Sequence, residues 1–275
     1  MRSKTSSGRK PPHHSRGKSV APRSSLPAGR AVIGIHAVTE ALRVRPRSVS
    51  PLWLRTGWQD SQELQKIEME ARSRQIRIEE YPAGHLDRLC SGHQGVLAFV
   101  NQDPELDWER LKGESIRRVV LLDGVEDPHN LGAILRTSWL LGVEAVFVPE
   151  MRAVHLSPAV SKVAQGALEH VPLEISSSMT QAIGLLKENG FWVFGLSHEA
   201  RSNLYDLKLP EKVAWVLGSE GAGLRKPVER QCDELISIPQ MDPQASFNVS
   251  VAAALALGET FRQHQILENP RNQGK

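Results

Sequence analysis

The chain has 275 residues, of which 40% are hydrophobic and 24% are charged, so it can bury a sizeable core and form two domains. No apolar run approaches the roughly 18 residues of a membrane-spanning helix, and the first residues lack the apolar centre of a signal peptide, so we expect neither a membrane protein nor a secreted one. Only two cysteines occur, Cys90 and Cys232, without a CxxC motif or a Cys/His cluster, which predicts no disulfide framework, no metal site and a reducing cytoplasm.

The N-terminal segment is basic. Its first 30 residues hold eight Lys or Arg and no acidic residue, so the rest of the chain carries a net charge of −5 against +3 for the whole. Because the segment is rich in Ser, Pro and Gly, it cannot bury enough apolar surface to offset its ordering entropy, and we predict that residues 1–29 form a disordered basic tail. Three roles stay open for this tail: an auxiliary RNA-binding arm, a solubilising segment, or a mitochondrial transit peptide, which would replace the cytoplasmic compartment.

Residues 30–100 alternate between short strands and helices, which predicts a small α/β domain. Strands are expected in AVI, VSPLWLRTG, RIEEYP and GVLAFV, and helices in IHAVTEAL and SQELQKIEMEARSRQ. Residues 101–115 are polar and contain a proline, so we expect them to form the linker to a second domain.

Residues 116–270 repeat a more regular pattern, which predicts an α/β domain built on a parallel sheet. Continuous apolar runs are typical of strands buried on both faces, with right-handed crossover helices on each side. The expected strands are VVLL, EAVFVP, VPLEI, FWVFGL, VAWVLG and ELISIP, and the expected helices cover residues 131–141, 158–168, 178–189, 224–231 and 248–265. In such sheets ligands bind at the carboxyl ends of the strands, so the turns after VVLL, VAWVLG and ELISIP are the places to seek chemistry.

The first of these turns is DGVEDPHNLGAILRTS, residues 123–138. We expect Asn130 to cap a helix that begins at Leu131, and Arg136 to project from a side of that helix other than its buried face. By themselves, the asparagine is an ordinary cap and the arginine an ordinary surface charge. His129 in this turn and His36 in the first domain are candidates for RNA contact, although a solvated side chain is the simpler interpretation of both.

The second turn is LGSEGAGL, residues 217–224, and the third is IPQMDPQASFNVSVAAAL, residues 238–255. Glycines in the second turn let the backbone approach a ligand closely, but the turn has neither a GK[ST] ending nor GxGxxG spacing, which argues against a nucleotide-binding P-loop and against a dinucleotide-dependent dehydrogenase. Glu220 in this turn, and Ser246 and Asn248 in the third, are each also explained as turn or cap residues.

Taken together and in this order, NxGAxxRT at 130–137, LGSEGxGL at 217–224 and IPxxxxxxSxNVSVAAA at 238–254 resemble the three motifs of the SpoU branch of the SPOUT superfamily, the RNA ribose 2′-O-methyltransferases. GIHAVTEAL at 34–42 and HQGVLAFV at 93–100 resemble the family's N-terminal RNA-substrate-binding domain, which has an L30e-like fold. Within the family, LLDGVEDPHNLGAILRTS and GALEHVP are most similar to the 23S rRNA guanosine-2′-O-methyltransferases.

The resemblance implies a C-terminal trefoil knot, S-adenosylmethionine as cofactor, RNA as substrate and a homodimer in which the final helix packs across the interface. It implies that Gly218, Ile238, Ser246 and Phe247 bind the cofactor. Phe247 stands where many relatives have leucine, which keeps an apolar wall.

The resemblance also implies that Asn130, Arg136, Glu220 and Asn248 form the catalytic set. Methyl transfer requires a ribose hydroxyl held in line with the donor, and placement of this kind is worth roughly 7–11 kcal/mol in good cases. Arginine is a poor proton acceptor because its pKa exceeds about 12, so we expect Arg136 to grip the RNA phosphate and stabilise developing alkoxide charge. Asn130 would orient the arginine or the ribose, Glu220 would fix the cofactor loop or the arginine, and Asn248 would complete the polar pocket.

Two rival functions remain open at this point. A transfer RNA methylated at a guanosine would use the same catalytic fold. A catalytically silent RNA-binding or assembly protein would use the fold without the reaction, and the presence of all the motif residues argues against it.

Overall fold

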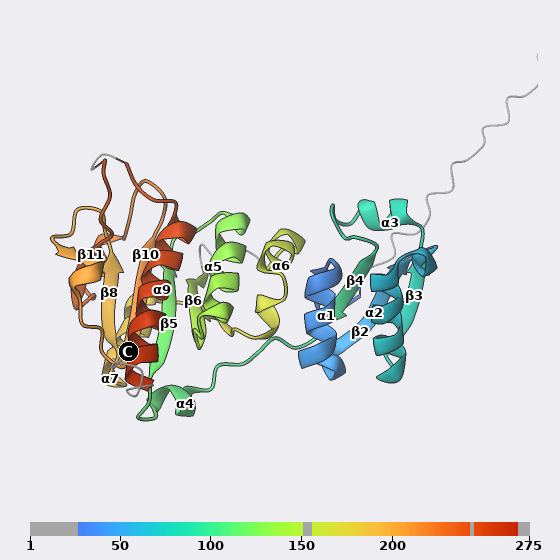
Figure 1. Cartoon of the computed structure of the whole chain (residues 1–275), viewed down its shortest axis with the longest axis horizontal. Coiled ribbons are helices and arrows are strands. Elements are labelled where there is room, and N and C mark those ends of the chain that lie inside the picture. Colours follow the sequence, from blue (N-terminus) through green and yellow to red (C-terminus); the bar gives the residue numbers. More distant parts are fainter. Residues whose placement is uncertain (1–26, 151–155, 243–244, 269–275) are drawn as a thin grey trace, which may run out of the picture.

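The computed structural model describes residues 27–150, 156–242 and 245–268, so most of the expected basic tail lies outside the described residues. Two α/β domains lie side by side, with the smaller N-terminal domain on the right in Figure 1 and the larger C-terminal domain on the left. No helix of the described chain is long and apolar enough to cross a membrane.

The N-terminal domain is a four-stranded sheet covered by helices on both faces. Its strands are β1 (Arg30–Ile33), β2 (Val49–Arg55), β3 (Ile78–Tyr81) and β4 (Val96–Val100), in the order β1-β4-β2-β3. One apolar face packs on α1 (Ile35–Val44) and α2 (Gln62–Ser73), and the other packs on Leu86 of the short α3 (Ala83–Asp87). Every strand and helix expected between residues 30 and 100 is present, and α3 is an addition.

The C-terminal domain is built on a seven-stranded sheet in which all the strand pairs are parallel. In sheet order the strands are β7 (Leu173–Ser176), β6 (Ala145–Pro149), β5 (Arg117–Asp123), β10 (Lys212–Gly218), β8 (Trp192–Leu196), β11 (Glu234–Ser237) and β9 (Ser202–Asn203). The six strands expected from the apolar runs are confirmed. The two-residue β9 has no apolar run of its own, which is why the sequence pattern missed it.

Helices cover both faces of this sheet. One face packs on α5 (Pro128–Leu140), α6 (Pro158–Ala164) and α9 (Val249–Glu268), and the other packs on α4 (Trp108–Lys112), α7 (Met179–Glu188) and α8 (Lys226–Glu229). The helix expected at 158–168 ends at Ala164, where Gln165 adopts a left-handed conformation, and a short 3₁₀ turn (Ala167–Glu169) follows. Helix α4 lies within the expected linker 101–115, and its Leu111 is fully buried in the core, so this segment is partly an element of the second domain.

The two domains contact each other through buried polar groups. Arg30 at the start of β1 pairs with Glu169 at 2.8 Å, and only 5% and 1% of these side chains is exposed. Next to this pair, His170 stacks on Trp139 of α5 with ring centroids 4.2 Å apart and contacts Glu40 of α1 at 2.9 Å. The N-terminal domain is therefore joined to the edge of the C-terminal domain that α5, α6 and the 3₁₀ turn form (Figure 1).

Candidate active site and cofactor pocket

Asn130 is brought to the carboxyl edge of the sheet by the start of α5. The expectation that it caps this helix is wrong, because the helix begins three residues earlier and Asp127 is the cap, accepting a hydrogen bond from the backbone amide of His129 at 3.1 Å. Pro128 in the first turn fits this earlier start, since amides of the first turn have no hydrogen-bond partner within the helix and proline has no amide hydrogen. Asn130 is thereby free of the capping role, and its side chain is 93% buried against the neighbouring loops.

Asn130, Glu220 and Asn248 form one hydrogen-bonded cluster, which we call the amide–carboxylate hub. The side-chain amides of Asn130 and Asn248 both donate to Glu220 Oε1, at 3.0 and 2.6 Å. The Asn248 amide also donates to Asn130 Oδ1 at 3.0 Å. Three residues separated by 90 and 28 positions in the chain are thus held within hydrogen-bonding distance of one another.

Asn248 has a second role at the start of α9. Its Oδ1 accepts hydrogen bonds from the backbone amide and the hydroxyl of Ser250, at 2.9 and 2.6 Å. Different atoms of the Asn248 side chain thus serve the start of the helix and the hub: Oδ1 accepts from Ser250, and the amide nitrogen donates to Asn130 and Glu220. Coupling of this kind fixes the hub to the first turn of α9.

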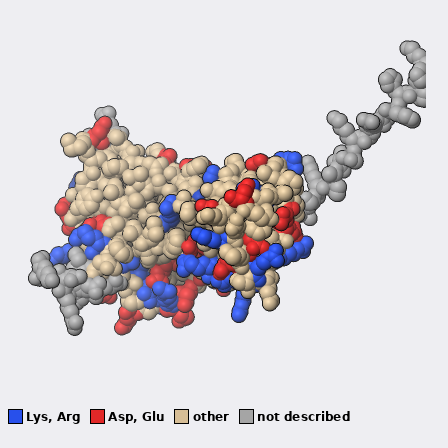
Figure 2. All heavy atoms as spheres, turned by 45° about the vertical axis from the view of Figure 1, so that its right-hand side comes forward, with Lys and Arg blue, Asp and Glu red and all other residues tan. Residues whose placement is uncertain are grey.

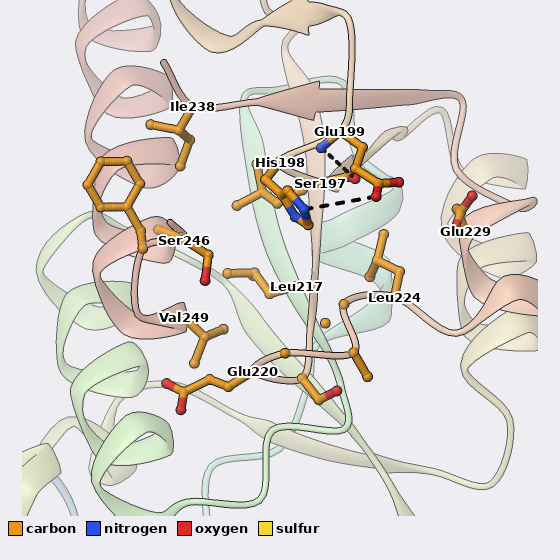
Figure 3. A pocket seen from close by; sticks show the side chains of 18 of the residues that line it. Ser197, His198, Glu199, Leu217, Glu220, Leu224, Glu229, Ile238, Ser246 and Val249 are labelled. Atoms are coloured by element: carbon orange, nitrogen blue, oxygen red, sulfur yellow. Dashed lines mark hydrogen bonds and ion pairs between the residues drawn. The ribbon is translucent and has the colours of Figure 1, made fainter. Parts of the chain in front are cut away.

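A cavity of about 290 Å³ lies beside the hub, at the carboxyl ends of β8, β10 and β11 (Figure 3). Gly218, Ile238, Ser246 and Phe247 all line it, as the resemblance implies, and Phe247 is 41% exposed. Its other lining residues include Leu196, Leu217, Leu224, Ile236 and Val249. The cavity combines an apolar wall with a few polar groups, which is the usual composition of a small-molecule site.

Gly218 shows how closely the backbone approaches itself at this cavity. A Cβ atom at position 218 would lie 2.1 Å from the carbonyl carbon of Gly223, so only glycine allows the loop 219–224 to close. Ser219 and Gly223 exchange backbone hydrogen bonds of 3.1 and 3.0 Å across the neck of this loop. Main-chain groups are therefore presented to a bound molecule without intervening side chains, which fits the adenosyl group that the resemblance implies.

The wall formed by residues 196–199 was not expected. Ser197, His198 and Glu199 follow β8 and line the cavity opposite Glu220 (Figure 3). The rule that ligands bind at the carboxyl ends of parallel strands would have found them. The turn after β8 contains neither glycine nor proline, so no local sequence signal marks it.

A second cavity, of about 330 Å³, adjoins the first and is lined by Gly124, Val125, Glu126, Asp127 and Asn130. Ser219, Glu220 and Val249 line both cavities, so Glu220 stands at the boundary between them. Glu220 of the hub thus has one cavity on either side.

Arg136 is not part of the hub. It lies six residues beyond Asn130 on α5, which at 100° per residue places it about 120° around the helix axis. Its side chain is exposed, lines neither cavity, and makes no hydrogen bond or ion pair with the residues that the structure describes. The expected contact of Arg136 with Asn130 or Glu220 is therefore absent within one chain, and Glu220 holds two amides instead.

His129 and His36 are exposed and line neither cavity. Within the described ranges, no group of three or more His, Cys, Asp or Glu side chains could hold a metal ion. Burial, followed by the charge of Asp233, raises the pKa of the Cys232 thiol to about 12, which makes it a poor nucleophile.

Comparison with known proteins covers both domains. Residues 117–258 match the family model of the SpoU rRNA methylases, and residues 31–106 match the model of the RNA 2′-O ribose methyltransferase substrate-binding domain. The 23S rRNA (guanosine-2′-O-)-methyltransferase RlmB of Neisseria meningitidis is 37% identical over 88% of this chain and 98% of its own length. RlmB of Nitrosomonas europaea is 40% identical over 85% of this chain and 91% of its own.

Among solved structures, the SpoU methyltransferase AviRb of Streptomyces viridochromogenes, in complex with S-adenosylmethionine, aligns with a TM-score of 0.73 at 23% identity, covering 86% of this chain and 90% of its own. The predicted fold class, a parallel α/β domain of the SPOUT type preceded by a small α/β domain, is confirmed. The chain belongs to the SpoU rRNA methylase family of RNA 2′-O-ribose methyltransferases and carries that family's substrate-binding domain before its catalytic one.

Proposed function

We propose that the protein transfers the methyl group of S-adenosylmethionine to the ribose 2′-hydroxyl of a guanosine in 23S ribosomal RNA. The amide–carboxylate hub between two adjoining cavities is the observation that carries this proposal. The names of the relatives, which match the chain over both domains, support the choice of 23S RNA and of guanosine.

The cavity lined by Gly218, Ile238, Ser246 and Phe247 would hold the cofactor, which supplies an electrophilic methyl group when bound. The cavity beyond Glu220 would then receive the nucleotide. Glu220 Oε1 is engaged by two amides, while Oε2 makes no hydrogen bond with the described residues and can accept one from the ribose hydroxyl. The rigid hub would thereby hold that hydroxyl in line with the cofactor cavity, which is catalysis by placement.

We further propose that the protein is a homodimer through α5 and α9. Leu140 of α5 and Val251 of α9 are 63% and 45% exposed, and Phe247 just before α9 is 41% exposed. Figure 2 also shows a broad area without charged side chains on the catalytic-domain side of the visible face. Arg136 lies one turn before Leu140 on the same face of α5, so it would reach the RNA from this interface rather than from within its own site.

Incubation of the purified protein with labelled S-adenosylmethionine and either protein-free 23S RNA or transfer RNA tests the substrate. We expect label in 23S RNA, at a single ribose that resists alkaline cleavage. Label in transfer RNA alone would favour the rival substrate. Absence of cofactor binding by calorimetry would favour the silent RNA-binding protein.

The role of Arg136 is tested by Arg136→Ala in single-turnover methylation. Loss of a charge-assisted hydrogen bond from the guanidinium to an RNA phosphate should raise the activation free energy by about 1.5–3 kcal/mol. We therefore expect the methylation rate to fall roughly 10- to 150-fold while cofactor affinity is unchanged. An unchanged rate with normal cofactor binding would remove Arg136 from the catalytic set.

A further inference from the structure

Asp123 is a buried carboxylate that lines neither cavity and belongs neither to the cofactor-binding residues nor to the catalytic set named above. It is the last residue of β5, and it is 1% exposed. Burial of an unpaired carboxylate is costly, so such a group must be paired. Its partner is Arg225, the residue that follows the loop 219–224.

Two hydrogen bonds and an ion-pair contact join Asp123 to Arg225. Oδ2 accepts from the backbone amide of Arg225 at 2.9 Å, Oδ1 accepts from Nε at 2.6 Å, and Nη2 lies 2.5 Å from Oδ1. A carboxylate that receives both a backbone amide and a guanidinium fixes the main chain as well as the side chain of its partner. Asp123 therefore determines where the chain continues after residue 224.

The same loop also begins beside Asp123. In the sheet, Gly218 of β10 is the register partner of Asp123 in β5. The loop 219–224 leaves β10 directly after that partner and returns to the Asp123 carboxylate at Arg225. Both ends of the loop thus lie next to one residue of the neighbouring strand, whose side chain holds the second end.

The separation of these two ends matters because the loop carries groups of both parts of the site. Gly218 borders the cofactor cavity, and Glu220 is the centre of the hub. The loop is closed so tightly that a Cβ at Gly218 would lie 2.1 Å from the carbonyl carbon of Gly223. Release of the Arg225 end would widen this neck and move main-chain groups that face the cofactor.

We propose that Asp123, with Arg225 as its partner, is a positioning residue for methyl transfer, which sets the closure of the loop 219–224 and so the cofactor affinity. This inference rests on the proposed function, since it assumes that the cavity beside the loop binds S-adenosylmethionine. A positioning shell of this kind holds a site within about half an ångström of its working geometry.

The test is S-adenosylmethionine binding to the full chain without RNA, measured by calorimetry, for Asp123→Asn, Arg225→Met and the double variant. Asparagine keeps the shape of the side chain but removes the charge that holds the guanidinium, and we expect affinity to fall about tenfold or more. We expect a loss of the same order in Arg225→Met and no further loss in the double variant, because each change breaks the same pairing.

Arg230→Met is the matched control. Arg230 is exposed at the other end of α8 and does not contact Asp123. The substitution removes the same charge as Arg225→Met, so its cofactor affinity should equal that of the unaltered protein. In steady-state assays the Michaelis constant for S-adenosylmethionine should rise in Asp123→Asn and Arg225→Met while that for RNA stays constant. Amide exchange of residues 219–225 should accelerate in the same two variants.

A purely structural pairing predicts a different result, namely a lower melting temperature with unchanged cofactor affinity, and this result would overturn the proposal. If Asp123→Asn does not fold, Arg225→Met decides, because the Arg225 side chain is 45% exposed and the Asp123 carboxylate keeps its hydrogen bond from the backbone amide of residue 225. Failure of the cofactor assignment on which this inference rests is distinguishable, since the unaltered protein would then bind no S-adenosylmethionine.

Discussion

Glu220 illustrates at the scale of one residue how a loop carboxylate organises a site. Both amides of the hub donate to the same oxygen, Oε1, so the arrangement depends on an acceptor at that position rather than on the full carboxylate. The remaining oxygen carries the chemistry that we propose, acceptance of a hydrogen bond from the ribose hydroxyl. The two functions of Glu220, geometry and charge, can therefore be separated by substitution.

Replacing Glu220 by glutamine keeps an acceptor oxygen for Asn130 and Asn248 but substitutes an amide for the free oxygen. We expect cofactor affinity to stay within about twofold and the methylation rate to fall about tenfold, since a charged hydrogen bond exceeds a neutral one by roughly 1.4 kcal/mol. In Glu220→Ala the buried Asn130 amide loses its partner, and we expect a rate loss of about a hundredfold. Equal rates for the two variants in single-turnover assays would show that geometry is not the role of Glu220.

At the scale of elements, α5 is held by two local features of its sequence. Asp127 and Pro128 define its start, and Gly132 allows α6 to approach its first turns. A Cβ at position 132 would lie 2.6 Å from Val163 Cβ and 3.1 Å from the backbone oxygen of Val160. The glycine of NLGA is thus a packing residue, and its place in the motif next to Asn130 follows from the need to keep α5 in position.

Gly132→Ala tests whether contact with α6 or helix propensity decides the stability effect of a side chain at position 132. Alanine gains roughly 1 kcal/mol over glycine in a helix interior, but overpacking against α6 costs typically 1–3 kcal/mol, so we expect net destabilisation of up to about 2 kcal/mol in urea unfolding. Gly184→Ala in α7 is the matched control, because no atom lies within 4 Å of its added Cβ, and it should stabilise by about 0.5–1 kcal/mol. Destabilisation by both changes would mean that contact with α6 is not the cause.

At the scale of the whole molecule, the placement of the substrate-binding domain depends on ionisable groups at the domain junction. Burial tends to raise the pKa of Glu40, but hydrogen bonds from Arg43 and His170 outweigh it and hold the pKa of Glu40 below its ordinary value of 4.5. The folded protein therefore binds this proton less readily than the unfolded chain. The contribution of Glu40 to stability is present above pH 4.5 and is lost as the pH falls through the depressed pKa.

Glu40→Gln should accordingly lower the free energy of unfolding at pH 7 by about 0.5–1 kcal/mol, the scale of a partly exposed ion pair. The difference from the unaltered protein should shrink when the pH is lowered below the depressed pKa, as measured by urea titrations at several values. Glu211→Gln, at an exposed position, is the control and should show no such dependence. A difference that persists in strong acid would exclude ionisation of Glu40 as its origin.

The sequence by itself determined the two-domain α/β architecture, the parallel strands and the motif residues, because apolar runs and glycine-rich turns are local signals. It also indicated that Asn130, Glu220 and Asn248 share one site, since the turns that hold Asn130 and Glu220 follow parallel strands and the loop that holds Asn248 follows a third, at the same edge of the sheet.

Only the tertiary structure decided which residues contact one another. Asp127 and Asn130 are equally good caps by type, and the choice between them depends on the packing of α5. The buried ion pair of Arg30 with Glu169 and the hydrogen bonds of Asp123 with Arg225 join residues far apart in the chain. The position of Arg136 away from the hub and the position of residues 196–199 at the cavity likewise depend on how distant segments pack. Such contacts are selected by the packed geometry of the whole fold, which no local pattern encodes.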